Sequence, residues 1–579
     1  MPDTLTIVNN KITDMIDLYA RMDKTAKLLY PEQNPYTITL FDSETPIDID
    51  KSISITSSLP ASYATALVTS LLEGEWQVKV EGKISERQQT AVKQFADDLL
   101  AGIDEYLLNE YAISSLNTWN ANHACIRSIV TGRLLLRKED DRLVITYMPC
   151  DARWTPYQLN QWIAPRTWRT KADIVKEYEK RPGIDKSVLD SLSDKGLLGI
   201  TDFWDKQKNE VWVTTGQAYS KSSYNASMGG IKLYEQKNPL GFLPFVVSSV
   251  SAGFMLRDEK YLEHEYDDIF QFNRHRYVDH NRNLSIKATM GMNIITPRFE
   301  REIDKGVADN PIPVPGADQT IHVPPGGKAV MVPQPDLNNA FIASSEQTDQ
   351  ELQMGGISNA ELADTNENRT AIWLATQSRI RGSRLKPRME CLQVFREALI
   401  KLAIRQIKAI SGDAEQTFSI GRSDAFSQFN IGKLGDPDTY RIKCRLMTRT
   451  KEEEIANIAE AAAAKSAGIP QTIIDRDILM AEDPEEWERQ RKLQAASEAD
   501  PALALFDQAR NMIDEAETMV DDDEANGKLL SSKQLTATAF EMVRQRSVQP
   551  MPSETVTPKR EVPKGNANAL IGLGAGGGL

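Results

Sequence analysis

Residues 344–410 decide the organisation of the chain, and they read SSEQTDQELQMGGISNAELADTNENRTAIWLATQSRIRGSRLKPRMECLQVFREALIKLAIRQIKAI. The first part has the composition of a short helix. That helix ends at Gly355-Gly356, because glycine allows the chain to change direction sharply. A polar, acidic loop follows over residues 357–369 and carries Asn359, Glu361, Asp364, Asn366 and Glu367. Taken alone, such a segment is equally well an ordinary surface loop.

A long helix is predicted after this loop, beginning near Asn368 or Thr370, which are both good N-caps. Its apolar residues recur mostly three or four positions apart, so one stripe faces a core: Ile372, Leu385, Met389, Leu392, Phe395, Leu399, Leu402 and Ile407. Pro387 lies inside the helix. An interior proline removes a backbone hydrogen bond and costs about 3 kcal/mol, so we expect a bend there.

The other faces of this helix are basic. They carry Arg379, Arg381, Arg384, Lys386, Arg388, Arg396, Lys401, Arg405 and Lys408, against only Glu390 and Glu397. Such a helix either binds nucleic acid or pairs its charges with acidic neighbours, and composition does not decide between the two. Aromatic residues do not alternate with these arginines, so a base-stacking platform is not indicated.

Length and composition limit the class of protein. At 579 residues the chain is too long for one core, so we expect several subdomains. No apolar run approaches the ~20 residues of a membrane span, and the N-terminus lacks the pattern of a secretory signal. The four cysteines form no CxxC pair, which disfavours zinc and favours reduced thiols. The net charge of −14 is unusual for a protein that grips nucleic acid through many phosphate contacts.

The N-terminal half predicts an α+β fold rather than alternating βαβ units. Helical patterns cover residues 1–30 and 84–130, and a Ser/Thr/Pro-rich segment with β-like pieces at 36–40 and 76–80 separates them. From 133 to 250 the pattern changes to short β-branched or aromatic runs, which predict strands at 133–136, 143–147, 211–214, 231–234 and 245–247. A helix near 170–194 interrupts them.

A single long helix is predicted over residues 258–287. Its first half is acidic and its second half basic, an order that suits the helix dipole and also suits staggered packing against copies of itself. We therefore expect contacts between subunits at Asp258, Glu263, Asp267, Arg274, Arg276 and Arg282.

Residues 291–340 interrupt the helical pattern with many prolines and glycines. Short strands fit between them at 319–323 and 328–332, so a compact β-rich excursion is predicted. A strand follows at 440–446, and residues 451–546 are mostly helical, with Pro470, Pro484 and Pro501 at helix starts. The acidic run 521–524 is predicted to be a solvated turn or helix end, and residues 547–579 are predicted to be disordered.

No catalytic constellation is recognisable. The sequence contains no GxxxxGK[ST], HExxH or GxSxG motif, and no GxGxxG after a strand. His264, His275 and His280 invite a metal hypothesis, but their spacing is off the one-face spacing of helix ligands, and ordinary surface histidines are favoured. We expect no catalytic residue, no cofactor and no metal.

The order of elements resembles that of portal proteins, the head-to-tail connectors of tailed double-stranded DNA bacteriophages. A helix, a Pro/Gly-rich β-excursion, a returning helix, a polar loop and a long kinked helix follow one another in that family. The run ISNAELADTNENRTAIWLATQSRIRGSRLKPR resembles a tunnel loop that leads into an Arg-rich helix, and YRIKCRL followed by KEEEIANIAEAAAAKSAGIP resembles the return to the wing and the entry into the crown. DARWTPY, VWVTT and NPLGFLPFVV resemble wing strands.

This resemblance implies a division of the chain into the parts of a portal subunit. These are N-terminal helices and wing sheet (1–257), first stem helix (258–290), clip (291–340), second stem helix (341–356), tunnel loop (357–369), long helix and rest of the wing (370–450), helical crown (451–546) and disordered tail (547–579).

The resemblance also implies a function without enzymatic activity. A homo-oligomeric ring, commonly dodecameric, would sit at one capsid vertex of the virion after assembly in the host cytoplasm. Double-stranded DNA would pass through its axis without sequence specificity, driven by a separate terminase. A tail adaptor and the major capsid and scaffold proteins would be further partners. The acidic loop residues would face the channel, and Arg379, Arg381, Arg384, Lys386 and Arg388 would contact DNA or a neighbouring subunit.

Two alternatives come from other classes of protein. One is a helical adaptor or scaffold protein of capsid assembly. The other is an intracellular enzyme of an unrecognised family, which the missing catalytic motifs argue against. Native mass separates them, because only a portal forms a closed ring of very high mass.

Overall fold

A computed structural model gives the fold as mixed α+β, in agreement with the class predicted from the sequence. It describes residues 3–38, 52–82, 84–139, 142–179, 184, 186–192, 194, 196–214, 230–250, 268–271, 273–295, 299–302, 328–331, 339–355, 371–411, 417–420, 428–447, 451–479, 487–488, 491–492, 495, 501–516 and 522–548. The chain forms two compact units, Met1–Ala456 and Asn457–Leu579.

The central sheet of the first unit has five strands in the order β10-β2-β3-β13-β14. Their bounds are Phe245–Ser249, Ile129–Glu139, Arg142–Cys150, Thr417–Ile420 and Gln428–Asn430. β2 and β3 form a long antiparallel hairpin, and β13 adds to β3 in parallel. The sheet therefore joins segments that lie on both sides of the long helix in the sequence, as the strand patterns at 133–136, 143–147 and 245–247 predicted in part.

A second sheet has six strands. Five of them lie side by side in the order β4-β5-β7-β8-β9, and β6 also pairs with β7. Their bounds are Tyr157–Gln158, Trp162–Ile163, Arg166–Arg169, Leu198–Asp205, Lys208–Thr214 and Gly230–Lys237. The helix predicted near 170–194 is present as two short helices, α6 (Lys171–Tyr178) and α7 (Lys186–Ser191). Both cover this sheet, because Ile174 and Leu189 lie in one buried cluster with Val213.

Two N-terminal helices connect these sheets. The single helix predicted over residues 1–30 is two, α1 (Thr4–Asp14) and α2 (Ile16–Leu29). Val8 of α1 packs with Trp162 and Phe203 of the second sheet. Met22 of α2 is buried in a cluster that includes Ile129 of the central sheet. The N-terminus therefore packs against both sheets.

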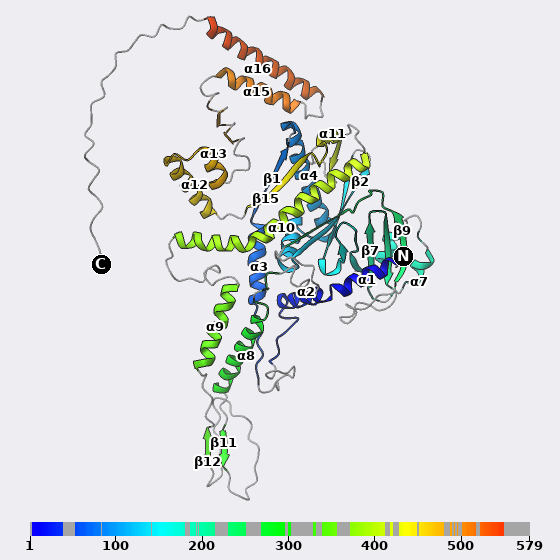
Figure 1. Ribbon diagram of the computed structural model, residues 1–579, viewed down its shortest axis with the longest axis vertical. Helices are drawn as coiled ribbons and strands as arrows, with labels where there is room; N and C mark the ends of the chain where they lie inside the picture. The colour runs from blue at the N-terminus through cyan, green and yellow to red at the C-terminus, as the bar shows by residue number, and fades with distance from the viewer. Residues whose placement is uncertain are drawn as a thin grey trace, which may run out of the picture. The chain divides into compact units, whose positions relative to one another are not determined.

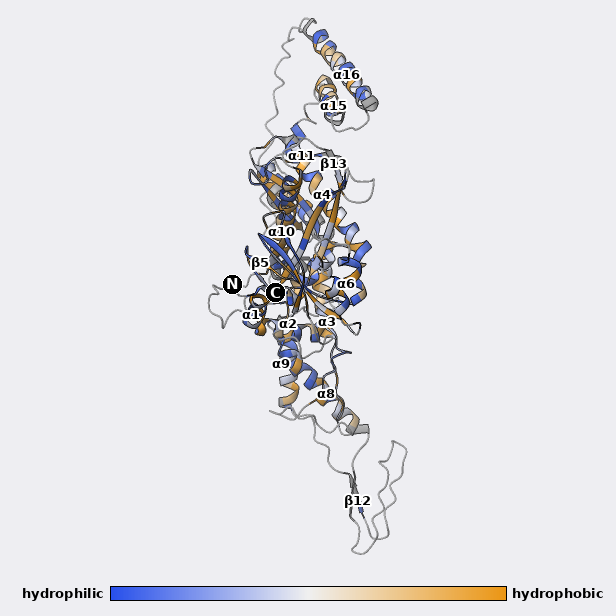
Figure 2. Cartoon of the chain, turned by 90° about the vertical axis from the view of Figure 1, so that its right-hand side faces the viewer, coloured by the Kyte–Doolittle hydropathy of each residue, from blue (hydrophilic) through white to orange (hydrophobic). Residues whose placement is uncertain are grey.

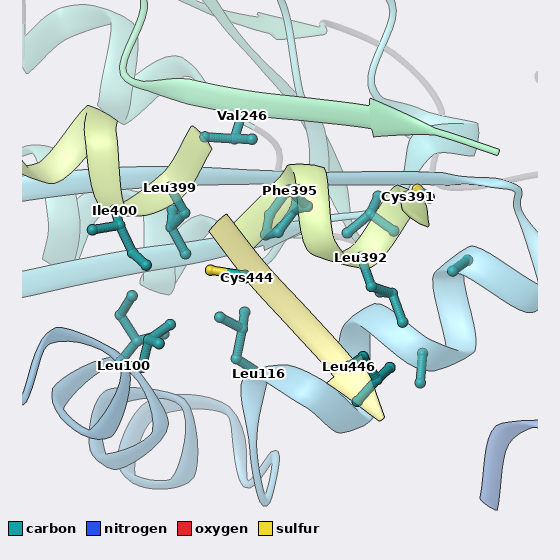
Figure 3. Close-up of a cluster of buried hydrophobic side chains, with 14 of the residues drawn as sticks. Leu100, Leu116, Val246, Cys391, Leu392, Phe395, Leu399, Ile400, Cys444 and Leu446 are labelled. Carbon is teal, nitrogen blue, oxygen red and sulfur yellow. The ribbon is translucent and has the colours of Figure 1, made fainter. Parts of the chain in front are cut away.

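The core of the first unit lies around α10 (Ala371–Ser411), the helix predicted over 370–412. Figure 1 shows α10 bent part-way along its length, and Pro387 lies inside it as predicted. Figure 3 shows Val246 of β10 on one side of α10, and Leu100, Leu116 and Leu446 on the other. A fully buried leucine or phenylalanine stabilises the fold by about 1.5–3 kcal/mol, so this two-sided burial makes α10 the main support of the core.

Three further elements complete this core. They are α4 (Glu86–Tyr111), α5 (Leu116–Ile126) and the antiparallel pair of β1 (Glu75–Gly82) with β15 (Tyr440–Met447). Helix α4 begins at Ser85, whose side chain accepts the Gln88 N–H, and Ser115 caps α5 in the same way. The predicted helical region 84–130 and the predicted strands 76–80 and 440–446 are therefore present.

Between residues 36 and 81, one helix was not predicted, and one predicted strand is not found where the structure describes it. Residues 59–72 form a helix, α3 (Leu59–Leu72), which begins with Pro60 in its first turn. Residues 36–38, predicted as part of a strand, have no strand partner among the described residues, and side chains bind their backbone instead. The Ser/Thr-rich composition explains both outcomes. Serine and threonine favour turns in isolated segments, but their hydroxyls also cap helices and form hydrogen bonds with backbone N–H groups.

The predicted helix over 258–290 begins later than predicted. Helix α8 runs over Arg276–Ile295, and residues 268–271 and 273–275 are in turns. Residues 258–267 lie outside the described residues. The physical reason is that Ile269 and Phe270 are drawn into the core, where the Ile269 N–H donates to the Cys125 carbonyl.

Two short strands follow α8 within the predicted β-rich excursion. β11 (Phe299–Glu302) pairs antiparallel with β12 (Lys328–Met331), and the predicted strand 319–323 lies outside the described residues. The chain then returns in α9 (Asn339–Gly355), close to the predicted 341–356. Figure 2 shows hydrophilic and hydrophobic residues interspersed along α8 and α9.

The boundary between the two units lies within α12 (Lys451–Ser466). The second unit continues with α13 (Gln471–Ile473), a π-helical turn (Ile474–Ile478), α15 (Pro501–Ala516) and α16 (Asp522–Val548). Pro470 caps α13 and Pro501 starts α15, as predicted, whereas Pro484 lies outside the described residues. The acidic run 521–524 was predicted to be a solvated turn or helix end, and Asp522, Asp523 and Glu524 are the first residues of α16, where carboxylates favour the positive end of the helix dipole.

Helices α15 and α16 pack through small side chains. Ala502 and Ala509 of α15, and Ser532 and Ala539 of α16, are buried, and Phe506 meets Phe540 edge-on at 5.1 Å. The predicted disordered tail, 547–579, lies outside the described residues after Val548.

Candidate functional site

The structure locates only part of the predicted site. The loop residues Asn359, Glu361, Asp364, Asn366 and Glu367 lie outside the described residues, as do Asp258, Glu263 and Asp267. Arg379, Arg381 and Arg384 belong to α10, but their side chains are not described. Of the remaining predicted basic residues, Lys386 is exposed and Arg388 is half-buried on the same helix.

Helices α8 and α9 form an antiparallel pair with a narrow polar seam. Ser345 and Thr348 of α9 are buried, and such small side chains allow two helices to approach closely. At one end of the pair, the Asn273 side-chain amide donates to the Leu352 carbonyl at 3.0 Å. The pair is therefore fixed in register by a buried side-chain-to-backbone bond as well as by packing.

Charged side chains cross-link the same two helices. Arg276 Nη2 lies 2.6 Å from Glu351 Oε2, and His280 Nδ1 lies 2.8 Å from Asp349 Oδ1. Asp279 lies 3.6 Å from Arg276 and 3.8 Å from Arg282. These groups are about a third exposed, so each pair contributes roughly 0–1 kcal/mol. Arg276 and Arg282, predicted to contact other subunits, therefore have carboxylate partners within the chain.

A buried carboxylate anchors the turns that precede α8. Asp268 is 5 % exposed, and both of its oxygens accept hydrogen bonds from Arg274 Nη2 at 2.7 Å. It also accepts from the Phe270 N–H and from the Thr25 hydroxyl of α2. Arg274 thus neutralises a buried charge in the core. Sequence reasoning assigned Arg274 to a subunit contact because the predicted helix 258–287 has an acidic first half and a basic second half.

The backbone of residues 53–57 lies along α8 on a ladder of polar side chains. The Ser57 N–H donates to Asn281, the Ile55 N–H to Ser285 and the Ile53 N–H to Thr289, at 2.9, 2.8 and 2.9 Å. Two residues of extended chain rise about 6.6 Å and four residues of helix about 6 Å, so alternate amides match acceptors four apart. We call residues 53–57 the strap.

The strap in turn binds a second extended segment. Ser54 accepts the Ile38 N–H at 3.2 Å, and Thr56 accepts the Tyr36 N–H at 2.7 Å. The alternation of SISIT at 52–56 and the four-residue spacing of Asn281, Ser285 and Thr289 are the sequence signals that sequence reasoning missed. Neither signal is specific alone, because polar residues at these spacings are also typical of an exposed surface.

The C-terminal half of α10 pairs its charges with acidic neighbours. Arg405 lies 2.7 Å from Asp438, and Lys408 lies 3.9 Å from Asp436. Arg396 is partly buried and stacks over the Trp76 ring at 4.2 Å. For Arg405 and Lys408, pairing within the chain is the better interpretation of the basic composition, and Arg396 is engaged by an aromatic ring instead.

The thiols are unsuited to nucleophilic chemistry. All four cysteines are buried, and burial raises the pKa of Cys125 and Cys391 to about 11 and of Cys150 and Cys444 to about 12. Nucleophilic cysteines need the opposite shift. Within the described part of the chain, no cluster of three or more His, Cys, Asp or Glu residues could hold a metal ion.

Comparison with known protein families and with curated proteins finds no match for this chain. In the helices that the structure describes, no segment is both long and apolar enough to cross a membrane. Function must therefore be argued from the arrangement of the elements.

Proposed function

We propose that the protein is a portal protein, which forms a ring at one capsid vertex and serves as the conduit for genome packaging and ejection. The observation that carries this proposal is the arrangement of α8, β11, β12, α9 and α10. Two paired helices flank a Pro/Gly-rich β-hairpin, and the second helix leads through residues 356–370 into a long helix that packs in the core. This order matches stem, clip, stem, tunnel loop and wing helix in the family that the sequence resembles.

The pairing of α8 and α9 suits a stem. A stem must transmit force between a clip that binds terminase or the tail adaptor and a wing embedded in the capsid. Cross-links by Asn273, Arg276 and His280 and the strap on α8 would hold such a helix pair as one rod. Because these charges are already paired within the chain, stem contacts between subunits would depend less on them than the sequence suggested.

The charge of the chain suits a conduit. DNA that passes through a channel must not be held tightly, and an acidic wall denies phosphates the counterion release that drives binding. The net charge of −14 per subunit agrees with such a wall. In this proposal the loop 357–369 is the tunnel loop, with Glu361, Asp364 and Glu367 toward the axis, and it contacts DNA without sequence preference because it lacks bidentate base readers.

Charge reversal in this loop tests the proposal. Rings with Glu361→Lys, Asp364→Lys and Glu367→Lys should retain DNA in a salt-dependent way and package or eject it more slowly, while ring assembly survives. A matched control reverses the same number of charges at exposed acidic positions near the two sheets, Glu73→Lys, Glu179→Lys and Asp190→Lys. Equal DNA retention by wild type and loop variant, with intact rings, would show that the loop does not line a channel.

A further inference from the structure

A small cavity lies where α3, α5, β1 and α10 meet. Its volume is about 10 Å³, and its apolar wall includes Leu71, Leu116 and Leu392. Three residues add polar character to the wall: Trp76, Asn120 and Arg396. A water molecule needs roughly 10–15 Å³ measured in this way, so the cavity has the size of one water and no larger ligand.

Buried polar atoms around this cavity lack hydrogen-bond partners among the described residues. Asn120 is 5 % exposed, and its Oδ1 is an unpartnered acceptor. Arg396 stacks its guanidinium face on Trp76, and its Nε and Nη1 are unpartnered donors. Burial of such a group without a partner costs about 1–3 kcal/mol, and more for a charged one, so native proteins rarely leave several together.

The charge of Arg396 is balanced only at longer range. Burial lowers the pKa of Arg396 from its usual range, and the more distant Cys444, Asp104 and Asp97 oppose this by favouring its charged form. Asp104 Oδ1 accepts the Leu116 N–H at 2.6 Å, and Arg396 Nε and Nη1 have no hydrogen-bond partner among the described residues. The in-plane edge of the guanidinium therefore needs a nearby acceptor that the neighbouring elements do not supply.

We propose that the cavity binds one ordered water, which accepts a hydrogen bond from Arg396 and donates one to Asn120 Oδ1. The unpartnered donors of Arg396 and the unpartnered acceptor of Asn120 together favour water, which can both accept and donate hydrogen bonds. A cation would be repelled by Arg396, and an anion such as chloride would face the Asn120 carbonyl oxygen. The water would join α5 to α10 across the cavity and satisfy the buried Arg396 without an ion pair.

An experimental structure of the full assembly, at a resolution that shows ordered waters, tests this directly. We expect one density peak within hydrogen-bond distance of Arg396 and Asn120 Oδ1. An empty cavity would overturn the proposal. So would anomalous signal at this position from crystals soaked in bromide, because it would identify an anion.

A pair of variants gives a test whose sign distinguishes a wet from a dry cavity. If water bridges the two side chains, Asn120→Leu displaces it, leaves Arg396 unpartnered and lowers the Tm by several degrees relative to Asn122→Leu. Asn122 lies on the same helix, is half-buried and donates to the Thr118 carbonyl, so it controls for the loss of an asparagine from α5. If the cavity is dry, Asn120→Leu removes an unpaired acceptor and raises the Tm, and the proposal fails.

Discussion

Gln406 offers a sharp test of how α10 is held on the central sheet. β10 pairs with β2 only as far as Arg133, and the Leu134 N–H donates to the Pro244 carbonyl at 2.9 Å. Beyond that point the fully buried Gln406 side chain continues the ladder. Its Oε1 accepts the Leu136 N–H at 3.0 Å, and its Nε2 donates to the Leu134 carbonyl at 2.7 Å. Gln406→Leu keeps the volume and removes both bonds.

The expected loss of stability follows from these two backbone groups. Each buried N–H or C=O without a partner costs about 1–3 kcal/mol, so the pair costs about 2–6 kcal/mol. Burial of the added apolar atoms offsets about 1–2 kcal/mol of this. We therefore expect the free energy of unfolding of the first unit to fall by about 2–3 kcal/mol, which is the difference between the middles of the two ranges.

Urea unfolding followed by tryptophan fluorescence measures this difference. Gln393→Leu is the matched control, because Gln393 is half-buried on the same helix, and its change should stay within about 0.5 kcal/mol. If Gln406→Leu and Gln393→Leu unfold at the same urea concentration, the two bonds contribute nothing and our account of the helix–sheet contact is wrong.

Three further predictions concern α5, α8 and the turns that precede α8. Burial lowers the pKa of His123 from 6.5 to about 4, so between pH 6.5 and pH 4 the unfolded state binds more protons than the folded state. The free energy of unfolding should therefore fall by about 3 kcal/mol as the pH drops through this range. His123→Gln should abolish that loss when unfolding is measured against pH. Ser285→Ala removes the acceptor of the Ile55 amide, which should exchange with deuterium faster while distant core amides do not change. Arg274→Met leaves the Asp268 carboxylate buried without its cation and should destabilise by about 3–5 kcal/mol in thermal unfolding; the added change Asp268→Asn should restore part of this, and no restoration would argue against the ion pair as the cause.

The sequence predicted elements whose signal is local. The helix predicted from the 3.6-residue periodicity of α10, the β-branched runs of β2, β3 and β8, and the strand predicted at 328–332, observed as β12, are all present in the structure. Each depends on residues within one short window, where apolar spacing and turn chemistry decide the backbone.

Features that depend on distant partners were not predictable in this way. Helix α3 lies in a Ser/Thr/Pro-rich segment in which no helix was predicted, and its burial comes from contacts with α5 and α10. The start of α8 was misplaced because Asp268 is neutralised by Arg274 and bound by Thr25, which lies 243 positions away. The strap on α8 joins segments more than 220 positions apart. No local pattern encodes such pairings.

The central claim is that this chain assembles into a closed ring. Electron microscopy of the purified full-length protein, together with its native mass, tests it most directly. The account predicts rings with a central channel, of a mass that is a high integer multiple of the 64.8 kDa chain and dodecameric if the resemblance holds. A protein that remains a 64.8 kDa monomer at all concentrations and salt conditions would contradict it.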